Sequence, residues 1–199
     1  MNSHSPRIAV VTGAAQGIGR VIALRLADEG LDVAVNDVAS KTDELQELVS
    51  QIQARGGRSL AVPADVSVEG DVEVMITKVV QEFGRLDVMV ANAGLAFYKT
   101  LIELPIEDFD KIVAVNIRGV MLCYKHAAIQ MIQQGKGGRI VGASSVAGKQ
   151  AVPMMSAYCA TKFAIRGLTQ SAALELSKYG ITVNCYAPGL IKTTLSAYS

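Results

Sequence analysis

The residues most able to carry out chemistry are a serine, a tyrosine and a lysine in the last third of the chain. Ser145 precedes Tyr158 by thirteen residues, and Lys162 follows Tyr158 by four. The four-residue spacing places the phenol and the ammonium on one face of a helix, one turn apart. A phenol at its ordinary pKa of about 10 is a weak acid at neutral pH, but a fixed cation nearby favours the phenolate. The three residues therefore predict a site where Tyr158 exchanges protons and Ser145 supplies a hydroxyl.

Short apolar runs alternate with helical patterns along the whole chain, and these elements must position the three residues. Continuous apolar runs, rather than alternating ones, are typical of parallel strands buried on both faces. Right-handed crossovers then place helices on both sides of the sheet. We expect an α/β fold with a doubly wound parallel sheet, the Rossmann fold. The expected strands cover 8–11, 33–35, 60–62, 86–91, 139–141 and 182–186, and the expected helices cover 17–29, 43–54, 68–83, 106–134 with a bend near 116–119, and 157–178.

A glycine-rich loop follows the first expected strand and opens the first expected helix. Its glycines, Gly13, Gly17 and Gly19, let the backbone turn sharply and approach a pyrophosphate, which the free N–H groups of the helix N-terminus attract. The spacing G-x-x-x-G-x-G differs from the commonest dinucleotide fingerprint. A glycine turn that binds no ligand is the alternative.

Asp37 ends the second expected strand. A carboxylate at this place accepts hydrogen bonds from ribose hydroxyls and repels a 2′-phosphate, and Gln16 in the glycine loop adds no positive charge. Both residues favour NAD(H) over NADP(H). The alternative is that Asp37 only caps the turn that follows it.

Length and composition indicate one domain over residues 1–199. Nineteen basic residues balance eighteen acidic ones without a basic block, so neither nucleic acid nor an anionic membrane is an expected partner. The start lacks the apolar region of a secretory signal, and no apolar run reaches the roughly 18 residues of a membrane span. Three scattered cysteines and two histidines suggest neither disulfides nor a metal site. We expect a cytoplasmic protein with buried free thiols.

The motifs occur in an order and spacing typical of one family. They are Thr12-Gly13 to Gly19, Asn92-Ala93-Gly94, Asn116, Ser145, Tyr158-x-x-x-Lys162 and Pro188-Gly189. With them, essentially the whole chain resembles the short-chain dehydrogenase/reductase family. The resemblance implies a Rossmann fold and a nicotinamide cofactor, here NAD. It also favours Ser145 over its neighbour Ser144 as the serine of the site.

The resemblance also implies a role for each matching residue. Tyr158 would be the acid/base, Ser145 would polarise the substrate oxygen, and Lys162 would bind the nicotinamide ribose and lower the pKa of Tyr158. Asn116 would hold a water that links Lys162 to solvent. The cofactor would be bound by Gly13, Gln16, Gly17, Ile18 and Gly19 at the pyrophosphate loop, Asp37 at the adenosine ribose, Asp65 and Val66 at the adenine, Asn92, Ala93 and Gly94 along the floor, Tyr158 and Lys162, and Pro188, Gly189, Ile191 and Thr193 at the nicotinamide.

The implied activity is the interconversion of a secondary alcohol and a ketone. Residues 138–193 resemble members acting on small hydroxyketones, diketones and diols, such as acetoin/diacetyl reductases and 2,3-butanediol dehydrogenases. A 3-oxoacyl thioester or a sugar or polyol is the alternative substrate. Met154 and Met155 precede the helix of Tyr158 and either face the substrate or fill gaps in the core. A catalytically silent nucleotide-binding homologue is the alternative to an enzyme.

Family members are usually longer than this chain. The resemblance therefore implies a Rossmann fold that lacks the last strand and a substrate-covering segment. We expect residues 182–186 to form a hydrophobic strand at the edge of the sheet. In the family, the helices around 116–134 and 157–178 commonly pair with their copies across a two-fold axis, which implies a homodimer.

Overall fold

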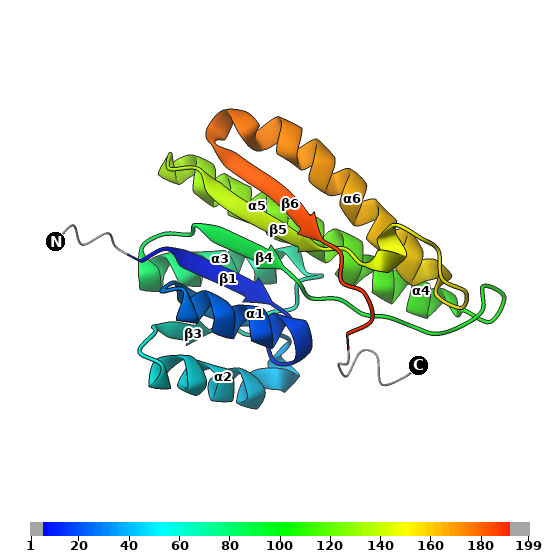
Figure 1. Ribbon diagram of the computed structural model, residues 1–199, viewed down its shortest axis with the longest axis horizontal. Coiled ribbons are helices and arrows are strands. Elements are labelled where there is room, and N and C mark those ends of the chain that lie inside the picture. Colours follow the sequence, from blue (N-terminus) through cyan, green and yellow to red (C-terminus); the bar gives the residue numbers. More distant parts are fainter. Residues whose placement is uncertain (1–5, 192–199) are drawn as a thin grey trace.

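The computed structural model describes residues 6–191, and its centre is one sheet of six parallel strands in the order β3-β2-β1-β4-β5-β6. In Figure 1 the strands lie side by side from β3 to β6. The order reverses between β1 and β4, which is the topological switch of a doubly wound sheet. The predicted fold class is confirmed. The strands are β1 (Ile8–Thr12), β2 (Asp32–Asn36), β3 (Ser59–Ala61), β4 (Val88–Ala91), β5 (Gly138–Ala143) and β6 (Ile181–Tyr186).

Helices cover the sheet from both sides because each crossover between parallel strands returns over a face. One apolar cluster joins β1 and β2 to α1 and α2, and a larger cluster joins the opposite face to α3, α5 and α6. The α-helices are α1 (Gly17–Asp28), α2 (Thr42–Ala54), α3 (Glu69–Phe83), α4 (Ile106–Val113), α5 (Val120–Gln134) and α6 (Ser156–Leu176).

The bend expected near residues 116–119 is a π-helical segment, Ala114–Gly119, inserted between α4 and α5. A π-helix adds a residue to the turn and is frequent at functional sites. Gly119, in this segment, packs closely against Val66 in the loop that follows β3. A Cβ on Gly119 would lie only 2.9 Å from the Val66 side chain. The insertion carries Asn116, which is fully buried.

The two ends of the sheet differ in burial. Every residue of β1 and β2 is buried, whereas β6 alternates, with Ile181 and Val183 buried and Thr182 and Asn184 exposed. Within the described residues β6 contacts β5, α6 and the short 3-10 turn Ser177–Tyr179, so only one of its faces is covered. The expected edge position of β6 is confirmed. The expectation of a hydrophobic edge holds for one face only, because the exposed side chains of Thr182 and Asn184 on the open face are polar.

The continuous helical stretch Ile106–Gln134 is long and apolar enough to cross a membrane by length and composition alone. Half of its most apolar window is buried inside this fold. The apolar residues of α5 contact the sheet in the larger cluster, including Leu122, Ala127 and Met131. Packing against β4 and β5 therefore accounts for the hydropathy of this helix.

Candidate active site

A cavity of about 790 Å³ opens at the carboxyl ends of the strands, between the loops that follow the neighbouring strands β1 and β4. Ligands of doubly wound sheets bind at this place because the flanking loops turn to opposite sides. Nearly all the predicted site residues line the cavity. These are Gly13, Gln16, Gly17, Ile18, Gly19, Asp37, Asp65, Val66, Asn92, Ala93, Gly94, Ser145, Tyr158, Lys162, Pro188, Gly189 and Ile191. Asn116 lies behind the wall, and Thr193 lies outside the described residues.

The glycine loop is folded so tightly that its glycines have little room for a side chain. Gly13 and Gly17 have φ angles of +64° and +56°, which favour glycine. A Cβ on Gly19 would lie 2.2 Å from the carbonyl oxygen of Gly13 and 2.5 Å from Nδ2 of Asn92. The loop leads into the N-terminus of α1, whose first N–H groups have no partner within the helix. Such a cradle fits the pyrophosphate of a dinucleotide.

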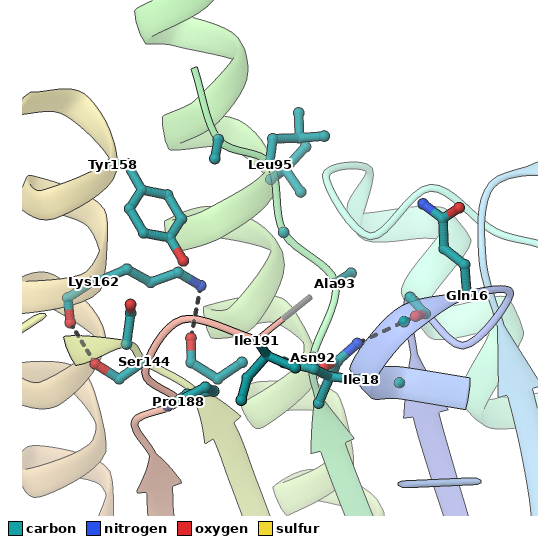
Figure 2. Close-up of a pocket in the computed structure, with 18 of the residues that line it drawn as sticks. Gln16, Ile18, Asn92, Ala93, Leu95, Ser144, Tyr158, Lys162, Pro188 and Ile191 are labelled. Atoms are coloured by element: carbon teal, nitrogen blue, oxygen red, sulfur yellow. Dashed lines mark hydrogen bonds between the residues drawn. The ribbon is translucent and has the colours of Figure 1, made fainter. Parts of the chain in front are cut away.

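Asn92 joins this loop to β4. Its Nδ2 donates to the carbonyl oxygens of Thr12 at 2.8 Å and Gly13 at 3.2 Å. The Thr12 hydroxyl accepts the backbone N–H groups of Asn92 and Ala93 at 3.0 and 3.1 Å. The two loops that flank the switch point are therefore bonded to each other by side chains as well as by the sheet. Figure 2 shows Asn92 and Ala93 beside Ile18 at this end of the cavity.

The position of Asp37 is compatible with both expected roles, ribose binding and capping of the following turn. One carboxylate oxygen accepts the N–H of Ala15 at 3.1 Å and the other accepts the N–H of Val38 at 2.9 Å, so the residue does cap its turn. A carboxylate has about four acceptor positions, and Asp37 also lines the cavity. It can therefore accept ribose hydroxyls while it holds the glycine loop. Lys41 lines the same end, with its ammonium 2.7 Å from Oε1 of Glu44.

Asp65 and Val66 lie at the far side of this end of the cavity. The Asp65 carboxylate accepts both the N–H and the hydroxyl of Ser67, at 2.9 and 2.7 Å. Its own N–H donates to Asp71 at 2.9 Å. Asp65 therefore fixes the turn after β3, and the buried Val66 presents an apolar surface to the cavity.

The two neighbouring serines have different partners. Ser144 donates its hydroxyl to the carbonyl oxygen of Lys162 at 2.9 Å and so ties β5 to α6. The Ser145 hydroxyl oxygen accepts the N–H of Ala147 at 3.1 Å and caps the 3-10 turn Val146–Gly148. An accepted bond leaves the Ser145 proton available for a second oxygen in the cavity. This geometry agrees with the preference for Ser145 over Ser144.

Tyr158 and Lys162 lie one turn apart on α6. The Lys162 ammonium is 5.3 Å from the centre of the Tyr158 ring and donates to the carbonyl oxygen of Ala143 at 2.8 Å. Figure 2 shows the phenol of Tyr158 directed toward the end of the Lys162 side chain. Lys162 is 4% exposed. The helix spacing therefore produces the expected juxtaposition, and β5 anchors the lysine.

The pKa predicted for the phenol is wrong in direction. Burial raises the pKa of Tyr158, while the neighbouring Ser145 hydroxyl acts the other way. Burial also lowers the pKa of Lys162 to about 8. The four-residue spacing predicts that the phenol and the ammonium lie close together, but it does not predict how deeply the two groups are buried. Burial removes water from both groups and so disfavours the charged form of each. Tyr158 therefore holds its proton and is set up as a hydrogen-bond donor.

Asn116 binds the chain just beyond β4. Its Nδ2 donates to the Leu95 carbonyl oxygen at 2.9 Å and to the Thr161 hydroxyl at 3.1 Å, and its Oδ1 accepts the Leu95 N–H at 2.8 Å. Both amide protons are used, but one acceptor position of Oδ1 remains. A Cβ on Gly94 would lie 3.3 Å from this oxygen and 3.5 Å from the Lys162 ammonium. The two atoms therefore flank the same small space beside Gly94.

Among the cavity residues that were not predicted from the sequence are Lys41, Tyr98 and Tyr186. Tyr98 packs with Tyr158 against the small cluster of Ala147, Met155 and Cys159. Met155 is thus both a cavity and a core residue, whereas Met154 is exposed and has a φ of +63°. The sequence offered one signal for the two tyrosines: Tyr98 follows the Asn92-Ala93-Gly94 motif closely, and Tyr186 stands just before Pro188. No group of three or more potential metal ligands lies among residues 6–191.

Comparisons with known proteins agree with this geometry. The family model for short chain dehydrogenases matches residues 7–199. A short-chain dehydrogenase/reductase of Armillaria gallica is 56% identical over 95% of this chain and 72% of its own length. A 3-oxoacyl-[acyl-carrier-protein] reductase of Staphylococcus aureus is 44% identical over 94% of this chain and 76% of its own. The crystal structure of an acetoin dehydrogenase from Salmonella typhimurium superimposes with a TM-score of 0.89 at 37% identity, covering 96% and 75% of the two chains.

The matched family model spans nearly the whole chain, and the relatives share both its sequence and its sheet. The chain is therefore an oxidoreductase of the short-chain dehydrogenase/reductase family.

Proposed function

We propose that this chain interconverts a secondary alcohol and a ketone with NAD(H) as the cofactor. The observation that carries the proposal is that one cavity holds the glycine cradle at one end and Ser145, Tyr158 and Lys162 at the other. The cradle fits a dinucleotide because the glycine loop lines the cavity and leads into the N-terminus of α1. A bound nicotinamide supplies or accepts the hydride. The protein's own residues hold the substrate oxygen and move its proton.

In the direction of reduction, Ser145 and Tyr158 donate hydrogen bonds to the carbonyl oxygen and Tyr158 gives up its proton. The raised pKa of Tyr158 keeps that proton in place until charge develops on the substrate oxygen. Lys162 then stabilises the phenolate from one helix turn away. A water between Oδ1 of Asn116 and the Lys162 ammonium, in the space beside Gly94, would return a proton to the site.

For the cofactor, the side chain of Asp37 supports NAD(H). Its carboxylate lines the cavity at the end of β2 and would repel a 2′-phosphate. The ammonium of Lys41, which also lines the cavity, is already paired with Glu44. We therefore infer a preference for NAD(H), carried mainly by the charge of Asp37.

For the substrate, we propose a small hydroxyketone, diketone or diol. Ala96, Val152 and Met155 give the cavity near Tyr158 an apolar wall, and Tyr98 adds a phenol. The likeness to an acetoin dehydrogenase supports this class. The likeness to a 3-oxoacyl reductase supports a 3-oxoacyl thioester as the alternative.

The test measures NADH binding and NADH oxidation separately, with acetoin, diacetyl, a 3-oxoacyl thioester and a sugar ketone. Tyr158→Phe should lower turnover by about 10²–10⁴-fold, the usual contribution of a general acid, without weakening NADH binding. Tyr179→Phe, which removes an exposed phenol outside the cavity, is the control. Equal rates in Tyr158→Phe and the wild type would remove Tyr158 from the mechanism. Binding without turnover would favour a silent nucleotide-binding homologue.

We further propose a cytoplasmic homodimer that pairs through the helices around 116–134 and 157–178. Large apolar side chains remain exposed on both, namely Met121, Ile129, Phe163 and Leu174. The thiols Cys123, Cys159 and Cys185 are free, which suits a reducing compartment. Light scattering tests the homodimer, and a tetramer would contradict it. Cell fractionation tests the cytoplasmic location.

A further inference from the structure

Tyr186 ends β6 and reaches across the sheet to the cofactor end of the cavity. Its hydroxyl donates to Oδ1 of Asn92 at 2.6 Å, although the two residues are 94 positions apart. β5 lies between β6 and β4 in the sheet. The contact therefore connects the edge strand with the loop after β4, over the carboxyl end of β5.

The bond sets the orientation of the Asn92 amide. Nδ2 faces two carbonyl oxygens, those of Thr12 and Gly13, and can only donate to them. Oδ1 faces the Tyr186 hydroxyl. A flipped amide would bring an oxygen against two oxygens and an NH₂ group against a donor, so all three contacts specify one orientation.

The same amide supports the pyrophosphate cradle. Nδ2 of Asn92 lies 3.0 Å from the place where a Cβ of Gly13 would be, and 2.5 Å from that of Gly19. Because the same Nδ2 also bonds the carbonyl oxygens of Thr12 and Gly13, a shift of the amide would disturb the start of the glycine loop. Burial raises the pKa of Tyr186, with a further contribution from Tyr158, so the hydroxyl stays protonated and remains a donor.

We propose that Tyr186 is a positioning residue for the dinucleotide: by fixing the Asn92 amide it holds the glycine loop in its binding shape. The proposal rests on the proposed function, because it needs a dinucleotide in the cradle. It assigns to β6, whose neighbouring loop carries Pro188 and Gly189, a contribution to binding at the opposite end of the cofactor site.

The test compares Tyr186→Phe with Tyr124→Phe. Tyr124 is also buried and its hydroxyl also makes one hydrogen bond, to Thr169 at 2.9 Å, but it does not line the cavity. Each variant loses one buried bond. Only Tyr186→Phe should raise the Kd for NADH, by about 3- to 10-fold, the usual worth of one hydrogen bond. Kd is measured by fluorescence titration, and unfolding in urea checks that both variants fold.

Two further measurements separate positioning from general destabilisation. Hydrogen exchange of the amides in residues 13–19 should speed up in Tyr186→Phe and not in Tyr124→Phe. In an Asn92→Ala background, Tyr186→Phe should change Kd by less than twofold, because the two residues act through one contact. Unchanged NADH affinity in Tyr186→Phe, or an equal loss in Tyr124→Phe, would overturn the proposal. A wild type that binds no NADH would instead overturn the proposed function.

Discussion

The two ends of the sheet are built differently, and each suits what it holds. β1 and β2 are buried at every residue between helices on both faces, and the glycine loop after β1 has no room for a Cβ at Gly13 or Gly19. Among residues 6–191, β6 is covered on one face only, and the neighbouring β5 has one exposed residue, Arg139. The cofactor end therefore depends on close packing at the glycine loop, whereas the catalytic end depends on a few polar contacts.

Those polar contacts are few but buried. Lys162 is anchored by one bond to Ala143, and Ser145 is oriented by one bond from Ala147. Burial makes each contact matter more, since an unpaired polar group away from water is costly. This difference predicts that a larger side chain in the glycine loop weakens cofactor binding. At the catalytic end, the loss of a polar group or a change of its charge should matter most.

The largest effect should come from adding one methyl group to the glycine loop. In Gly19→Ala the new Cβ would lie 2.2 Å from the Gly13 carbonyl oxygen, so the loop must move and the Kd for NADH should rise on the order of 100-fold. Gly167→Ala is the matched control on α6, where a Cβ meets no atom within 4 Å. It should stabilise the fold by about 0.5–1 kcal/mol, as measured by urea unfolding. Equal NADH affinity in the two variants would contradict the shape argument.

The next effect concerns the charge of Lys162. Its pKa falls from 10.5 to about 8 on folding, so between these values the unfolded chain binds more protons than the folded one. The free energy of unfolding therefore gains from Lys162 as pH rises through this window, and the cost of burying the charge is fully present below pH 8. Between pH 8 and 9.5 the gain should be about 1–2 kcal/mol.

Lys162→Met should remove that gain while it fills the same space. The measurement is urea unfolding of the wild type and the variant at several pH values, with the difference between the two proteins taken at each. Staying below pH 10 avoids the opposite effect of the tyrosines, whose raised pKa values cost stability above that pH. Parallel pH profiles would show that Lys162 is not desolvated in the folded protein.

The sequence was sufficient to predict the sheet and most of the cavity wall. Parallel strands leave continuous apolar runs, and the glycines, Asp37 and Asn92 each follow a strand, so their meeting at one edge is a consequence of topology. The helix spacing likewise predicted Tyr158 beside Lys162. These features are local in the sequence or follow from the order of the strands.

Other features depend on contacts that no local pattern contains. The Tyr186 hydroxyl meets Asn92 from 94 residues away, and Tyr186 was expected only as a strand residue. The pKa of Tyr158 was predicted in the wrong direction because desolvation is a property of the packed site. The one-sided burial of β6 reflects the packing of α6 on only one face of that strand.

A smaller effect should follow from removing the charge of Asp37. Asp37→Asn keeps an oxygen for one of the two capping bonds and no longer repels a 2′-phosphate. The preference for NADH over NADPH should fall about 10-fold, as expected for one screened charge pair. The ratio of kcat/KM values for the two cofactors measures it. Asp65→Asn, on the adenine side, is the control, and an equal change there would assign the preference to overall charge.

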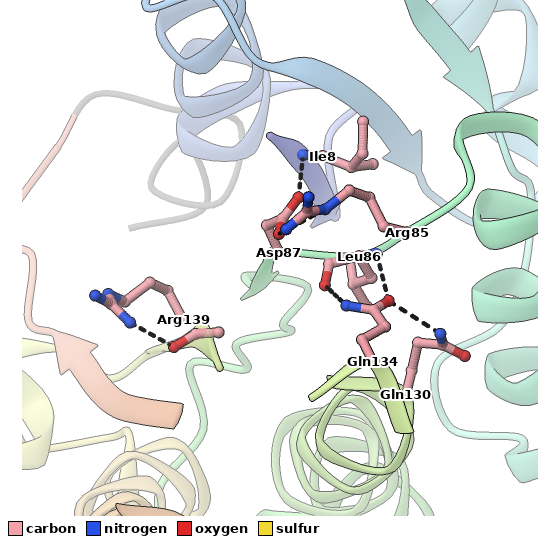
Figure 3. Close-up of polar contacts among 8 residues, drawn as sticks. Ile8, Arg85, Leu86, Asp87, Gln130, Gln134 and Arg139 are labelled. Carbon is pink, nitrogen blue, oxygen red and sulfur yellow. Dashed lines mark hydrogen bonds and ion pairs between the residues drawn. The ribbon is translucent and has the colours of Figure 1, made fainter. Parts of the chain in front are cut away.

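The amino-terminal edge of the sheet, opposite the cavity, holds a polar network of its own. Gln134 at the end of α5 accepts the N–H of Leu86 and donates to the carbonyl oxygen of Leu86, both at 2.8 Å. Asp87 accepts the N–H of Ile8 at 2.8 Å and pairs with Arg85. Figure 3 shows these contacts between α5 and the start of β4. They stabilise the sheet at a distance from the cofactor.

The smallest functional effect is therefore expected at Gln134. Gln134→Ala removes both hydrogen bonds with Leu86 and the one from Gln130. The Leu86 backbone N–H and carbonyl lose these partners, so the free energy of unfolding should fall by about 1–3 kcal/mol. NADH affinity and turnover should stay within twofold of the wild type, because no residue of this network lines the cavity. Urea unfolding and NADH titration of the same sample measure both quantities. A loss of NADH affinity comparable to that of Tyr186→Phe would mean that general loosening of the sheet, and not the contact with Asn92, controls the glycine loop.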